Sequence, residues 1–340
     1  KRITNPVIKP EYSIGQNFDS NAGSYTTSGN MVFPLSSSSY LRLNGSKSDA
    51  GNYETGSGIK PLTEYSTTDY TAILGTILSD GSKLEFNYTN NRQDKVGYPG
   101  LTMDIVYSYT DMYTLKYQRV TPFMFFSSMN IDLFNTDIDH LMDNVVLRGN
   151  SGNGVMAWPT ASDTYGGRLI GTIGSDMRTG IDYEHNRKDA EQYMVMSGSN
   201  TFLTYLWPGV ETEKLGIFFE KDLGNISYGL RYDQVELDPT KAADDAGGMM
   251  FKTANEVYTT DYDGTIVATK REYDNISGFL RFTKDIDHGE TYINLSVNER
   301  APDTTELFHA KWNASSAMMR HVGNPNLSSE RHMTIEVGYE

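Results

Sequence analysis

His140 and Met142 are two residues apart, and together they could bind a metal ion. Residues two apart on a β-strand point to the same side, so an imidazole and a thioether at this spacing can converge on one ion. A neutral imidazole with a soft thioether suits copper, and Cu(I) in particular, better than Ca²⁺, Mg²⁺ or Mn²⁺. The two can also be ordinary loop residues, because a chain with 15 Met residues contains such spacings by chance.

Six further methionines lie in segments that we expect to form external loops. They are Met194, Met196, Met249, Met250, Met318 and Met319. They would be low-affinity thioether sites that bind copper before it reaches His140 and Met142. Methionine also fills irregular gaps in loops, and we favour that role for these six residues.

The composition excludes several classes of function. The chain has no Cys, which removes zinc-thiolate sites, iron–sulfur clusters and a Cys nucleophile. Its formal net charge is −15, with 29 basic among 44 acidic residues, whereas a nucleic-acid partner requires clustered Lys and Arg. No Ser, His and acid trio and no Gly-rich phosphate loop stand out by spacing. We therefore predict no enzymatic activity, no prosthetic group and no nucleic-acid partner, with cations as the more natural cargo.

Alternation with a period of two is the strongest pattern in the chain, and it defines the elements that must position His140 and Met142. Apolar and polar or small residues alternate in residues 84–89, 226–233, 293–298 and 333–340. Met129, Ile131 and Leu133 alternate with polar residues in the same way, and His140 and Met142 continue the polar parity. We expect the apolar parity of each strand, such as Leu230 and Leu295, to face outward and the polar parity, such as Arg231 and Asn294, to face a lumen.

The predicted connections alternate between tight turns and long loops. The long loops cover residues 46–64, 92–111, 140–163, 186–211, 236–272 and 299–331. Short turns at one rim and long loops at the other are typical of outer-membrane barrels, in which about 9 to 11 residues per strand cross the bilayer. The sequence therefore predicts an all-β, antiparallel transmembrane barrel with about 14 strands in this chain. A soluble or surface-attached β-rich module that binds glycans or proteins is the alternative from another class.

Two motifs in the last fifth of the chain resemble a known family. Residues 298–303 read Asn-Glu-Arg-Ala-Pro-Asp, and residues 323–330 read Gly-Asn-Pro-Asn-Leu-Ser-Ser-Glu. In this order they resemble the late-barrel signature of TonB-dependent receptors, which have about 22 strands around a plugged lumen. The resemblance implies that residues 1–10 end the plug domain or link it to the barrel. Residues 11–340 would then form roughly the first two thirds of the barrel, without the plug and the last strands.

The resemblance also implies a location, partners and a cargo. The protein would be an active importer in the outer membrane of a Gram-negative bacterium, in contact with lipid and lipopolysaccharide. The TonB energy-transducing complex would bind an N-terminal segment outside this chain. Residues 137–144, Asp-Ile-Asp-His-Leu-Met-Asp-Asn, are similar to a stretch of the TonB-dependent copper receptors, which implies that His140 and Met142 bind copper together with a Cys and a Met of the plug. A ferric siderophore or haem remains the alternative cargo.

Overall fold

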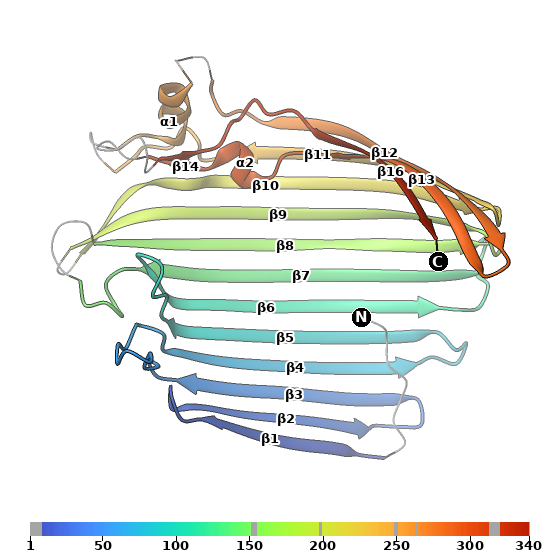
Figure 1. The fold of residues 1–340 in the computed structure, drawn as a ribbon, viewed down its shortest axis with the longest axis horizontal. Coiled ribbons are helices and arrows are strands. Elements are labelled where there is room, and N and C mark those ends of the chain that lie inside the picture. The colour runs from blue at the N-terminus through green and yellow to red at the C-terminus, as the bar shows by residue number, and fades with distance from the viewer. Residues whose placement is uncertain are drawn as a thin grey trace.

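The computed structural model describes residues 9–150, 155–196, 199–247, 251–262, 264, 266–312 and 320–339. Its main element is an antiparallel sheet of 14 strands in which almost every strand pairs with its neighbours in sequence. Figure 1 shows these strands side by side as an open, curved wall. The strands β1 and β16 lie at its two edges and do not pair with each other. The predicted antiparallel barrel fold and strand number are confirmed, and the barrel is not closed within this chain.

The elements have the following bounds. The strands of the main sheet are β1 (Glu11–Asp19), β2 (Ser24–Pro34), β3 (Ser39–Ala50), β4 (Tyr65–Ile77), β5 (Lys83–Val96), β6 (Asp104–Arg119), β7 (Ser128–Asp143), β8 (Met156–Ile173), β9 (Met177–Met196), β10 (Ser199–Asp222), β11 (Ile226–Pro239), β12 (Arg271–Ile286), β13 (Gly289–Arg300) and β16 (Glu330–Tyr339). The connections carry α1 (Ala254–Asp261), α2 (Thr304–Phe308) and a small hairpin of β14 (Ala310–Lys311) and β15 (His321–Val322). No helix in the described part of the chain is long and apolar enough to cross a membrane.

The connections differ between the two rims, as predicted. One rim carries short turns, and the opposite rim, on the left of Figure 1, carries most of the longer connections together with α1 and the β14–β15 hairpin. The prediction of a long loop over residues 186–211 is wrong, because β9 and β10 continue through this segment and pair with each other. The pairing of β10 with β9 is irregular between Phe202 and Val210. This irregularity accommodates Pro208 and also Gly209, which has a φ of 56°. A bulge absorbs such residues without ending the strand.

The two faces of the sheet have opposite character, because direct cross-strand partners point to the same side. The outer face carries a continuous row of exposed aliphatic residues, including Leu230 (56% exposed) and Ile276 (61% exposed). The other face, here called the lumen face, carries Arg231, which forms ion pairs with Asp182 at 2.9 Å and with Asp233 at 2.5 Å. The predicted assignment of faces is therefore confirmed.

The main hydrophobic cluster lies between the lumen face and the connections that fold over it. Val210 on β10 and Leu237 on β11 are buried together with residues of α1 and α2. The hydroxyl of Tyr258 on α1 donates a hydrogen bond to the carbonyl of Phe308 at 2.7 Å. This cluster fixes residues 301–312 and 320–322 against the inside of the wall, where an external loop over residues 299–331 was expected.

Candidate functional site

His140 and Met142 both lie on the lumen face, near the end of β7 that adjoins the long connections. His140 pairs with Ser108 on β6 and Thr160 on β8, and Met142 pairs with Trp158 on β8. Through this register they share a face with the polar residues that line the wall. The predicted placement on one side of one strand therefore agrees with the structure.

Two more methionines lie on the lumen face close to Met142. Met156 on β8 and Met194 on β9 are direct cross-strand partners. Met156 precedes Trp158, the partner of Met142, by two residues and points to the same face. Diagonal neighbours of this kind have backbones about 7–8 Å apart, within reach of long side chains. The register thus brings three thioethers and one imidazole onto one region of the wall.

Sequence reasoning missed Met156 and interpreted Met194 as a loop residue. The available signal for Met156 was parity, because Met156, Trp158 and Thr160 alternate with Ala157 in the same strand. The side chain of Met196 and the whole of Met249, Met250, Met318 and Met319 lie outside the described residues. Within the described part of the chain, no group of three or more His, Cys, Asp or Glu side chains could hold a metal ion.

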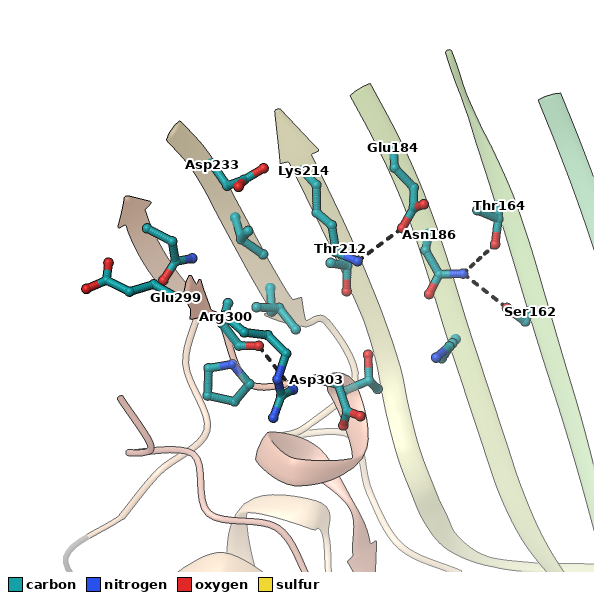
Figure 2. Close-up of a pocket in the computed structure, with 17 residues that line it drawn as sticks. Ser162, Thr164, Glu184, Asn186, Thr212, Lys214, Asp233, Glu299, Arg300 and Asp303 are labelled. Carbon is teal, nitrogen blue, oxygen red and sulfur yellow. Dashed lines mark hydrogen bonds and ion pairs between the residues drawn. The ribbon is translucent and has the colours of Figure 1, made fainter. Parts of the chain in front are cut away.

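A cleft of about 570 Å³ opens on the lumen face next to these residues, between β8–β13 and the start of α2. Figure 2 shows hydrogen-bonded polar side chains on one part of its wall: Asn186 donates to Ser162 at 3.1 Å and to Thr164 at 2.6 Å. Ser162 is the cross-strand partner of Ile138, one step from His140 along the same face. The cleft and the His140–Met142 pair are therefore adjacent parts of one lumenal surface.

Two buried polar atoms in the cleft lack a partner among the described residues. They are Oδ1 of Asn275, in a residue only 1% exposed, and Oγ1 of Thr212. The charges around them are mixed, and Lys214 is paired with Glu184 at 3.2 Å. Because buried polar groups are normally hydrogen-bonded, the cleft can accept a polar group.

The rim of the cleft is held by an ion-pair network around Arg300. This guanidinium contacts Glu306 on α2 at 2.9 Å and Glu330 on β16 at 2.8 Å. Hydrogen bonds from Arg300 and from the backbone of Asp303 lower the pKa of Glu306 to about 2. Asp303 and Glu306 also form a reciprocal cap at the start of α2. The network joins the beginning of the 301–329 connection to its end.

Comparisons with known proteins address the fold of the whole chain. The family model for the TonB dependent receptor-like beta-barrel matches residues 8–340. Among solved structures, the copper transporter OprC has a TM-score of 0.77 and 18% identity, covering 100% of this chain and 52% of that one. The hemophore receptor HasR of Serratia marcescens, in complex with HasA and heme, has a TM-score of 0.64 and 18% identity, covering 97% and 50%.

A siderophore receptor, PiuA of Acinetobacter baumannii, has a TM-score of 0.62 and 12% identity, covering 99% of this chain and 55% of that one. The chain thus spans about half the length of these solved structures. No curated protein sequence matches it. At these identities the likeness establishes the fold, and the three proteins named carry different cargoes.

Proposed function

The chain belongs to the TonB-dependent receptor β-barrel family, and we propose that it is part of the lumen wall of an outer-membrane importer of copper ions. The family consists of outer-membrane transport receptors, so the alternative of a soluble glycan- or protein-binding module is not retained. Residues 1–10 would form the end of a plug domain or its link to the barrel, and the TonB complex would act on the N-terminal part of the receptor. Transport energy would come from this partner, since the chain shows no nucleotide-binding motif.

We propose copper as the cargo because several soft donors lie on one face of the wall. His140 and Met142 lie on β7, and Met156 and Met194 lie on the next two strands. Neighbouring strands are about 4.8 Å apart, so the thioethers of Met142 and Met156 on adjacent strands can approach one ion, and Met194 adds a third thioether one strand further away. Imidazole and thioether ligands favour copper over the hard cations that prefer carboxylates. The fold of the copper transporter OprC is similar, which adds support at the level of architecture.

An organic iron chelate, either a ferric siderophore or haem, is the second candidate cargo. The 570 Å³ cleft beside His140 favours it, because Asn275 and Thr212 offer unpartnered polar atoms to a larger ligand. HasR and PiuA, which share the fold, are described as hemophore and siderophore receptors. A copper ion alone would leave most of this cleft unused.

Metal binding by the full-length protein tests the proposal. We expect the His140→Ala, Met142→Ala double variant to lose tightly bound copper, with Met142→Ala penalising Cu(I) more than Cu(II) because thioether softness matters most for the reduced ion. A matched control is His332→Ala with Met333→Ala on β16, since these adjacent residues point to opposite faces of one strand. Equal copper affinity in the wild type and the His140–Met142 variant would refute the assignment. Tight binding of a ferric siderophore or haem, with none of copper, would favour the second candidate.

A further inference from the structure

The β14–β15 hairpin places two histidines side by side. The ring centres of His309 and His321 are 6.1 Å apart, with an angle of 71° between the planes. His321 pairs with Lys311, and the backbone amide of Gly323 donates to the carbonyl of His309 at 2.7 Å. The two imidazoles are therefore diagonal neighbours on one small ladder, which fixes their separation.

This hairpin lies over the part of the lumen face that carries His140 and Met142. Nζ of Lys311 is 4.8 Å from the ring centre of Trp158, the cross-strand partner of Met142. The hairpin thus folds back from the end of the wall to the level of the proposed copper ligands.

A second contact places the hairpin independently. The ring of His309 is 6.2 Å from that of Trp207 on β10. Trp207 pairs with Ala190, and Ala190 pairs with Thr160, the partner of His140. His140 and Trp207 are therefore three strands apart in one row, about 14 Å at the usual strand spacing.

We propose that His309 and His321 form a second copper-binding site at the mouth of the lumen, from which the ion passes to His140 and Met142. The cargo in this inference rests on the proposed function. An imidazole nitrogen binds a metal at about 2.0 Å, which puts the ring centre about 3.1 Å from the ion, so two imidazoles in a nearly linear arrangement have centres about 6.2 Å apart. The observed separation of 6.1 Å matches this value, and Cu(I) accepts two nearly linear ligands.

His309 and His321 differ in their exposure to solvent. Burial, with the nearby side chains of His321 and Lys311, lowers the pKa of His309 to about 4. His321 is exposed and His309 is partly buried, so the pair leads from solvent towards the wall.

A site with two protein ligands binds the ion with low affinity. Low affinity is appropriate for a site that the ion occupies only transiently on its way inward. Transport through successive sites requires each to bind firmly enough to admit the ion and loosely enough to release it. The His309–His321 pair would hold copper less tightly than the region around His140, which adds thioethers from three strands. The ion would then move inward along increasing affinity.

The test is a titration of the full-length protein in detergent with Cu(I), under reducing conditions and in competition with a chromophoric chelator. We expect two bound ions in the wild type, with the weaker one absent from a His309→Gln, His321→Gln variant and the tighter one unchanged. The His140→Ala, Met142→Ala variant should show the opposite loss. A His288→Gln variant, altered in the turn between β12 and β13 at the opposite rim, should bind both ions.

The outcomes separate this inference from the proposed function. A second site is supported if the His309→Gln, His321→Gln variant loses only the weakly bound ion and cells that carry it take up copper more slowly. If the hairpin variant keeps both ions, or if the wild type binds only the ion that depends on His140, the second site is refuted and the proposed function stands. If the wild type binds no copper, both are refuted. Heat-modifiable migration on a gel checks that each variant is folded, and a folded His309→Ala, His321→Ala variant should repeat the result of the Gln variant.

Discussion

Arginine in place of Leu230 should destabilise the barrel strongly, because this side chain lies on the outer face near the middle of the bilayer. Leu230 is four residues after Ile226, the start of β11. At about 3.4 Å per residue and a tilt of about 40°, it lies about 10 Å above the short-turn rim, close to the middle of an apolar band about 25 Å tall. An Arg at this depth costs about 2–4 kcal/mol. The unfolding equilibrium should shift by a factor of about 30 to several hundred.

Gln234 provides a control for depth on the same strand. It shares the parity of Leu230 and is also exposed, but lies about 21 Å above the same rim, where Arg costs about 0–1 kcal/mol. Urea unfolding of the full-length protein from lipid vesicles, followed by Trp fluorescence, would give both free energies. Leu230→Ala supplies the reference for loss of the leucine, which packs on Gly278 of β12. If Leu230→Arg costs no more than Gln234→Arg, this face of β11 is not in the bilayer.

Three further results are expected. Met156→Ala should lower affinity for Cu(I) more than for Cu(II), and it should also lower stability, because Gln192 loses the thioether to which its amide donates at 3.0 Å; equal losses for the two ions in a metal competition assay would argue against thioether binding. Because the pKa of Glu306 is about 2 in the folded protein and 4.5 is its ordinary value, its contribution to stability is complete above pH about 4.5 and is lost as the pH falls towards 2. Glu306→Gln should remove that acid dependence in hydrogen exchange of α2, and an unchanged profile would contradict the coupling. Tyr258→Phe should cost about 1–3 kcal/mol, because the buried carbonyl of Phe308 loses its donor; limited proteolysis of the connection would detect the loosening, and wild-type resistance would speak against it.

Periodicity alone predicted the faces of the wall, for a simple physical reason. A strand in a barrel wall contacts lipid on one side and a polar lumen on the other. Successive side chains therefore alternate between an apolar and a polar environment. Leu295 and Asn294 illustrate this rule, and His140 and Met142 follow it. A property of single strands could therefore be predicted from the sequence.

Properties that depend on pairing could not be predicted in this way. The proximity of Met156 to Met142 follows from the register of β7 with β8, and no local pattern in the sequence encodes that register. A long loop over residues 186–211 was predicted, but β9 and β10 pair through this segment, and the irregularity at Pro208 and Gly209 stays local. Likewise, His309 and His321 become neighbours only because a connection of more than ten residues folds into a hairpin.

The two motifs that carried the family resemblance meet in space, and this contact explains why they matter together. Arg300 belongs to the first motif and Glu330 to the second, and their side chains form an ion pair at 2.8 Å at the base of the connection between β13 and β16. Glu306 binds the same guanidinium from α2, so one arginine joins the start, the helix and the end of that connection. The β14–β15 hairpin begins two residues after α2. Its position over the lumen face, and with it the proposed approach of copper to His140, therefore depends on a base that the two motifs build jointly.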